Sequence, residues 1–155
     1  MITMGLPQDP QVLAAIGKIA LRHGQLDYSM KMTIKTLADL PIAEAIDGTQ
    51  KQGSRTLRER VRHLARKRIG ESAAMVRLDA ILERARRATE RRNTLLHGLW
   101  AHELDGVPVI RDSGIEFGPI PTVSELEAVA DELATKAKDL TFARLDGFLH
   151  EALTN

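Results

Sequence analysis

Apolar residues recur at steps of three and four along most of the chain, which is the spacing of one face of an α-helix. Between Pro10 and Leu40 they form one continuous stripe: Val12, Ile16, Ile19, Leu26, Met30, Ile34 and Leu37. Further helices are expected from about Ser54 to Ile69, from near Ser72 to His97, and from Thr122 to the C-terminus. The pattern therefore predicts an all-α fold, a bundle of four to five helices.

A small β-hairpin is expected after the helix that ends at His97. Two short apolar runs, 99–104 and 107–110, are joined by Asp105-Gly106, a dipeptide typical of tight hairpin turns. Pro108 has no N–H to donate, which favours an edge position for the second strand. Residues 1–9, with an early proline, are expected to form a flexible arm. The predicted domain is thus one helical bundle over residues 10–155, with the hairpin at about 99–111.

Composition excludes several kinds of site. The chain has no Cys, which rules out disulfides, zinc–thiolate sites and cysteine nucleophiles. No His, Asp or Glu residues show a repeated metal-ligand spacing, and no glycine-rich phosphate loop is present, so we expect no metal and no cofactor. No apolar run is long enough to cross a membrane, and the N-terminus does not resemble a signal peptide. A cytoplasmic protein is expected.

Charge is unevenly distributed, although the net charge is only +1. Residues 51–92 contain 14 Lys and Arg against 5 Asp and Glu, whereas residues 93–155 contain 4 against 11. This segregation is compatible with a local positive field that attracts an anionic partner. It is equally compatible with two solvated helix faces of opposite sign that lie side by side.

Arg92 interrupts the apolar stripe of the helix that ends at His97. A guanidinium on the core side of a helix needs a partner, because an unpaired buried charge costs several kcal/mol. His23 and Asp27 interrupt the stripe of the first helix in the same way, four residues apart. One hypothesis is a structural pair, Asp27 with Arg92 or with His23, that only fixes the register of the helices. The other is that Asp27 holds Arg92 at the floor of a cleft, aimed at an anion.

The segment ERRNTLLHG, residues 90–98, places Arg92, Asn93 and His97 in the order R-N-x-x-x-H. This segment resembles the signature of HEPN domains, which are small helical bundles that include many metal-independent endoribonucleases of prokaryotic defence and toxin systems. In that family the motif also lies at the end of a long helix. Arg58 and His63 have the same spacing, but no Asn follows that Arg and no Gly follows that His.

The resemblance implies a homodimer in which two copies of the motif face each other across a shared cleft. In the family, the 2′-OH of RNA attacks the adjacent phosphate and leaves a 2′,3′-cyclic phosphate and a 5′-OH end. His97 would act as general acid–base, Arg92 would stabilise the charge that develops on phosphorus, and Asn93 would be the polar residue that follows the Arg. An antitoxin or another regulatory protein is an expected partner.

Exposed arginines before the motif, Arg84, Arg87 and Arg91, are expected to bind RNA phosphates. Alternatively, these arginines pair with the acidic last helix through Glu127, Asp131 or Glu132.

The function expected from the resemblance is therefore an endoribonuclease or RNA-binding protein. The alternative is a non-catalytic helical dimerisation or interaction module with a buried Arg92–Asp27 pair. A third hypothesis is a HEPN fold that has lost cleavage and retains only RNA or nucleotide binding.

Overall fold

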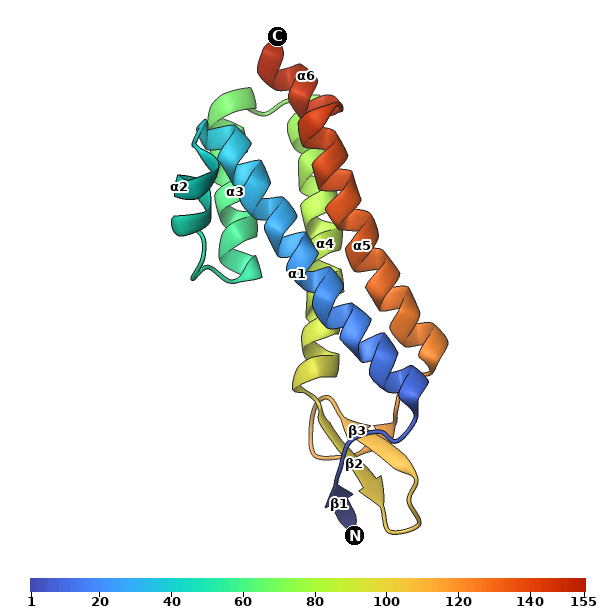
Figure 1. The fold of residues 1–155 in the computed structure, drawn as a ribbon. Coiled ribbons are helices and arrows are strands. Elements are labelled where there is room, and N and C mark those ends of the chain that lie inside the picture. The colour runs from blue at the N-terminus through green and yellow to red at the C-terminus, as the bar shows by residue number, and fades with distance from the viewer.

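The computed structural model describes all 155 residues as a mostly helical molecule with a small sheet at one end (Figure 1). The helices are α1 (Pro10–Ala38), α2 (Ile42–Asp47), α3 (Ser54–Ile69), α4 (Ala73–His97), α5 (Val123–Leu145) and α6 (Phe148–Thr154). The strands are β1 (Ile2–Met4), β2 (Leu99–Glu103), β3 (Pro108–Arg111) and β4 (Gly118–Pro119). The predicted helical bundle with a hairpin after its fourth helix is present, but the sheet has four strands rather than two.

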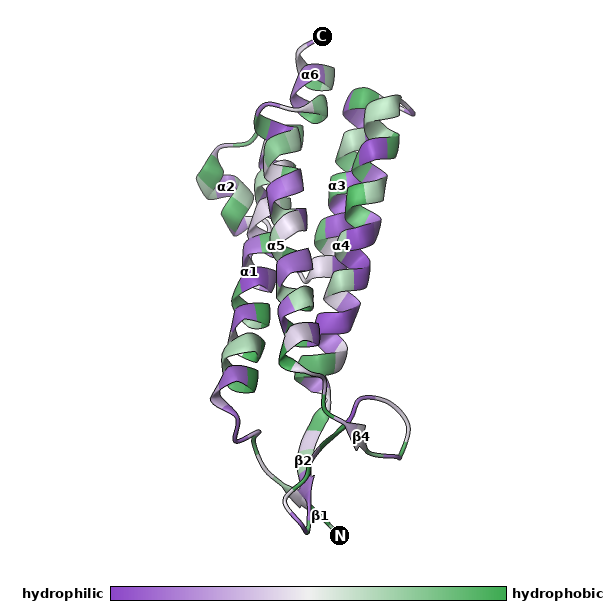
Figure 2. Cartoon of the chain, turned by 90° about the vertical axis from the view of Figure 1, so that its right-hand side faces the viewer, coloured by the Kyte–Doolittle hydropathy of each residue, from purple (hydrophilic) through white to green (hydrophobic).

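The four long helices form the bundle. α1 contacts both α5 and α3, and α4 also contacts both α5 and α3. Hydrophobic residues recur along each long helix between hydrophilic ones (Figure 2). The fully buried large side chains come from all four helices: Ile19, Leu26, Met30, Ile34, Leu37, Leu57, Met75, Leu78, Leu82, Leu95, Leu126 and Leu133. Burial of these apolar side chains is the main force that holds the helices together.

Helix starts follow the local chemistry of the sequence. The predicted helix from Ser54 to Ile69 is confirmed, and Ser72 caps α4 by accepting a hydrogen bond from the N–H of Met75 at 3.2 Å. At the start of α5, the predicted capping box is also confirmed, since Thr122 and Glu125 each accept a hydrogen bond from the other's backbone N–H. These hydrogen bonds hold the pKa of Glu125 below its usual value.

The last helix is not continuous, which corrects the sequence prediction. α5 ends at Leu145, and α6 begins at Phe148 after a break at Asp146 and Gly147. The N–H of Gly147 donates to the carbonyl of Phe142 at 2.9 Å, which closes the end of α5. After the break, Leu149 is fully buried against the core. The short helix after the break thus adds an apolar side chain to the core.

Part of the N-terminal arm, Ile2–Met4, forms a strand, which the sequence did not predict. β1 pairs antiparallel with β2, with Thr3 opposite His102, so the first residues are tied to the strand that follows α4. The sheet order is β1-β2-β3-β4, which makes β3 an inner strand and not the edge strand that Pro108 suggested. Pro108 is tolerated because it is the first residue of β3.

The hairpin itself is as predicted. β2 and β3 pair antiparallel, with Trp100 opposite Ile110, and Gly106 takes a φ of 87° in the connecting turn. A residue other than glycine is strained at that φ. Trp100 donates a hydrogen bond from Nε1 to the carbonyl of Leu95 at 2.8 Å, so it anchors the hairpin to the end of α4.

Gly98 connects α4 to β2. A glycine is required at this position because a Cβ would clash with neighbouring atoms, and not because of the backbone angles. Its φ is −63°, but an added Cβ would lie 2.8 Å from the carbonyl oxygen of Thr94 and 2.9 Å from Cδ1 of Ile110. We therefore expect Gly98→Ala to lower the free energy of unfolding by about 1–3 kcal/mol in urea denaturation. Gly118→Ala, which meets no atom within 4 Å, is the control. Equal stability of the two variants would contradict this interpretation.

Candidate functional site

Arg92, Asn93 and His97 lie on the last two turns of α4. Nη1 of Arg92 donates a hydrogen bond to Oδ1 of Asn93 at 2.8 Å. Arg92 is half-buried, and its Nε is buried without a hydrogen-bond partner. Asn93 and His97 are both exposed and are four residues apart, so they share one side of the helix. The motif therefore presents an amide and an imidazole to solvent, with a guanidinium bound to the amide.

Of the two pairs that the sequence left open for Asp27, the ion pair with Arg92 is absent and the contact with His23 is present. Asp27 instead accepts a hydrogen bond through Oδ1 from the hydroxyl of Ser54, the first residue of α3, at 2.7 Å. Its Oδ2 lies 3.9 Å from Nδ1 of His23, which is an ion-pair distance but too long for a hydrogen bond. The short serine side chain reaches Asp27 directly, so the carboxylate needs no guanidinium. Ser54 was not singled out in the sequence analysis, because serine is common at helix N-termini, where its hydroxyl often caps the helix.

His23 is buried, with 8% of its surface exposed, and its Nε2 lies 3.0 Å from the Ser54 hydroxyl oxygen. That hydroxyl has one hydrogen, which it donates to Asp27, so Nε2 of His23 must be the donor in their hydrogen bond. Nδ1 then carries no proton in the neutral ring. Burial lowers the pKa of His23; nearby Asp27 raises it in part, while the positive charges of Arg92 and Arg58 lower it further. A neutral His23 fits both observations.

Arg58 is the second residue that the sequence analysis missed. It lies on α3 with 6% of its surface exposed, its Nη1 is buried without a hydrogen-bond partner, and it forms no ion pair. Burial lowers the pKa of Arg58, the charge of Arg62 lowers it further, and Asp27 opposes both. The available signal was its position between Leu57 and Val61 on the buried side of α3.

We call His23, Asp27, Ser54, Arg58 and Arg92 the polar junction, because these side chains come from α1, α3 and α4. The junction has one carboxylate and two guanidinium groups, and its histidine favours the neutral form. Its net charge is therefore positive, and an anion that approaches it is favoured electrostatically. Anion binding is the chemistry that this arrangement supports best.

The arginines predicted to bind RNA lie on another side of α4. Arg84, Arg87 and Arg91 are all exposed, and their spacing puts them on one side of the helix. At 100° per residue, Asn93 and His97 point about 120–160° away from Arg91. The three arginines and the motif therefore do not form a single surface.

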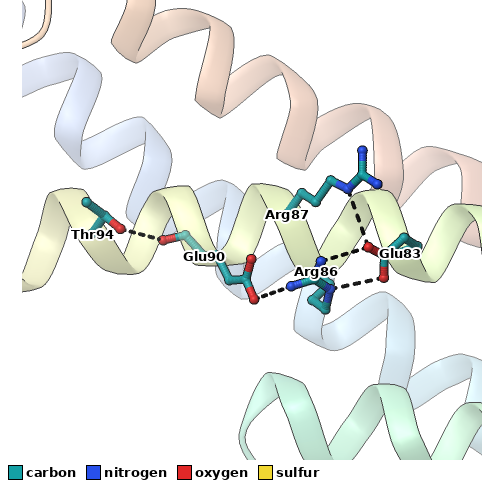
Figure 3. A network of polar contacts seen from close by, with 5 residues as sticks. All are labelled: Glu83, Arg86, Arg87, Glu90 and Thr94. Atoms are coloured by element: carbon teal, nitrogen blue, oxygen red, sulfur yellow. Dashed lines mark hydrogen bonds and ion pairs between the residues drawn. The ribbon is translucent and has the colours of Figure 1, made fainter.

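Ion pairs within α4 neutralise part of its basic charge (Figure 3). Arg86 contacts both Glu83 and Glu90, and Arg87 contacts Glu83 at 3.4 Å. The hydrogen bond from Arg86 lowers the pKa of Glu83 to about 2, with smaller contributions from Arg87. The Glu83 carboxylate therefore stays ionised at neutral pH.

The alternative pairing of Arg84, Arg87 and Arg91 with the last helix is not observed. Glu127 pairs instead with Lys18 of α1 at 2.9 Å, and Asp131 and Glu132 form no ion pair. Arg84 and Arg91 form none either, so they remain free to meet an external anion.

No protein-family model, curated protein or solved structure matches the chain. No helix combines the length and the apolar character that crossing a membrane requires. No group of three His, Asp or Glu side chains is arranged to hold a metal ion.

Protonation of His23 should destabilise the fold. Its pKa is lowered on folding, so the unfolded chain binds the proton more readily, and the free energy of unfolding falls as the pH drops below about 6.5. We expect His23→Gln to lose less stability than the wild type between about pH 8 and pH 5.5 in urea denaturation. His63→Gln, at an exposed position, should retain the wild-type slope. Parallel curves for wild type and His23→Gln would contradict the prediction.

Arg58 should lower stability rather than support it, because its buried guanidinium has no partner. An apolar side chain of similar length removes the desolvation cost, so we expect Arg58→Met to raise the free energy of unfolding by about 0.5–2 kcal/mol. Arg62→Met is the matched control: Arg62 binds Asp79 at 2.8 Å, and its loss should be destabilising. A less stable Arg58→Met protein would show that the guanidinium is structurally required.

Proposed function

We propose that this protein is a HEPN-like, metal-independent endoribonuclease or RNA-binding protein that acts as a homodimer. The observation that carries the proposal is the arrangement of the R-N-x-x-x-H segment. Arg92 is hydrogen-bonded to Asn93, and Asn93 and His97 are exposed on one side of the end of α4. Cytoplasmic location and control by an antitoxin or another regulatory protein belong to the same proposal.

The chemistry needs no group beyond these side chains and the RNA. The 2′-oxygen of the RNA attacks the adjacent phosphorus, the bond from phosphorus to the 5′-oxygen breaks, and a 2′,3′-cyclic phosphate and a 5′-OH end result. His97 transfers the proton as general acid–base, and Arg92 stabilises the negative charge on the phosphoryl oxygens. The hydrogen bond from Arg92 to Asn93 engages Nη1, and Nε is buried, so Nη2 is the guanidinium nitrogen left to contact phosphate.

A second copy would complete the site. α3 begins at Ser54, whose hydroxyl contacts His23 and Asp27 near the middle of α1. The first turns of α1 and the last turns of α4 therefore extend past α3, as Figure 1 shows. This arrangement supports docking of a second copy beside Asn93 and His97, which would bring two motifs together.

The alternative is a non-catalytic dimerisation or interaction module, in which the expected Arg92–Asp27 pair would play no part. Asp27 binds Ser54, and Arg92 binds Asn93. Arg92 and Asp27 are thus engaged with other residues.

The test is RNA cleavage by purified protein in excess EDTA. We expect wild-type protein to cleave a mixed RNA pool and leave 2′,3′-cyclic phosphate ends, and we expect His97→Ala to lose about 100-fold or more of this rate. His63→Ala is the matched control, because His63 is exposed and follows Arg58 at the same spacing. Light scattering on the same samples should show a dimer at micromolar concentration.

Equal cleavage by wild type and His97→Ala would overturn the assignment of His97. A monomer with full activity would overturn the composite site. Salt-dependent RNA binding without cleavage would support the RNA-binding form of the proposal, and absence of both binding and cleavage would reject it.

A further inference from the structure

A groove of about 750 Å³ runs along the line of contact between α1 and α5. Its floor consists of small residues, including Gly24 on α1 and Ala134 and Ala137 on α5. The hydroxyl of Ser29 lines the same groove and donates to the carbonyl of Ala137 at 2.9 Å, which holds the two helices together. The floor is therefore a fixed surface, and its small side chains allow another chain to approach closely.

Large apolar side chains form the walls of the groove although they are exposed. Leu21 is 72% exposed and Phe142 64% exposed, and Tyr28 and Leu145 are each at least half exposed. These four side chains lie together on one surface instead of being scattered. A continuous apolar surface of this kind is typical of a site that another molecule covers.

Two cations lie at this groove without carboxylate partners. Arg22 on α1 donates a hydrogen bond only to Gln25, at 2.9 Å, and Lys138 on α5 forms no hydrogen bond or ion pair. Further along the same two helices, Lys18 and Glu127 do pair across the line of contact. Asp146 is the single acidic residue at the groove, at one end. The groove is thus apolar at its centre and has a net positive charge.

The net positive charge of the groove determines which kind of partner it fits. A second copy docked groove to groove would bring two sets of Arg22 and Lys138 together, and like charges at an interface oppose association. A helix with an apolar face and acidic flanks complements both features instead. On α5 the groove extends from Ala134 to Leu145, about 16 Å at 1.5 Å per residue, which matches about three helical turns.

We propose that the α1–α5 groove binds an acidic amphipathic helix of another protein. Apolar side chains at helical spacing insert between the walls, and carboxylates on the flanks pair with Arg22 and Lys138. This proposal goes beyond the proposed ribonuclease function, because the groove lies on α1 and α5, whereas Arg92, Asn93 and His97 lie on α4, behind these two helices in Figure 1.

One glycine substitution blocks the groove, and another serves as its control. An added Cβ at Gly24 meets no atom within 4 Å, so Gly24→Leu should fold while its side chain fills the floor. Gly17 is equally unobstructed, lies seven residues earlier on the same helix and does not line the groove. Gly17→Leu therefore makes the same change of residue and leaves the groove open. Lys138→Glu reverses one of the two unpaired charges.

The probe is a displayed library of helical peptides of about 14 residues, with apolar residues fixed at positions i, i+3, i+4 and i+7 and all other positions random. We expect selection on the wild-type protein to enrich Asp and Glu at the flanking positions. In fluorescence anisotropy, Gly24→Leu should bind an enriched peptide at least about tenfold more weakly than wild type or Gly17→Leu does. Lys138→Glu should also weaken binding.

Three results would overturn the proposal. The first is failure to enrich any peptide that distinguishes wild type from Gly24→Leu. The second is enrichment of peptides without excess negative charge, which would remove the argument from Arg22 and Lys138. The third is a wild-type dimer that Gly24→Leu dissociates while Gly17→Leu does not, because the occupant would then be a second copy.

Discussion

The contact between α1 and α5, which run in the same direction, positions the rest of the molecule: Lys18 meets Glu127, and Ser29, further along α1, meets Ala137. It is the most extensive contact between any two elements of the fold, and Leu26 of α1 and Leu133 of α5 are both fully buried within the core. Ser29 and the Lys18–Glu127 ion pair add polar contacts between the helices. Because α1 also contacts α3, and α5 also contacts α4, this pair packs against both helices that carry Arg58 and Arg92. The groove and the polar junction are thus consequences of one packing arrangement.

The polar junction departs from the rule that buried charges are paired. The chain has 21 acidic residues for 22 Lys and Arg, and elsewhere it uses them, as Arg62 and Arg86 show. Arg58 remains without a partner although it is buried, and its neighbour His23 has a lowered pKa. Departures of this kind cost stability and occur preferentially at functional sites, where strained or unpaired groups are kept for chemistry. The junction therefore supports the proposal that this end of α4 meets an anion.

Local sequence chemistry predicted most of the fold but not the contacts between distant residues. The capping box at Thr122 and Glu125 and the turn at Gly106 depend on neighbours in sequence, and both were predictable. The β1 strand depends on β2, nearly 100 residues later, so the sequence of residues 1–9 alone suggests a flexible arm. The partner of Asp27 was not predictable from local sequence either. Asp27 binds Ser54 and not Arg92 because of the distances at which α3 and α4 pack. The R-N-x-x-x-H residues could be named from the sequence and their role stays a prediction, whereas Arg58 as a buried residue could be recognised only from the structure.

The two basic features of α4 bear differently on the proposed ribonuclease. Arg84 and Arg91 are exposed and unpaired on one side of the helix, while Asn93 and His97 lie on another. Long-range attraction of RNA depends on the total unpaired positive charge, to which Arg84 and Arg91 contribute wherever they point. Cleavage depends on groups within hydrogen-bond distance of one phosphate, a condition that only residues on the side of His97 can meet. Affinity for RNA and the rate of cleavage would therefore be set by separate residues of the same helix.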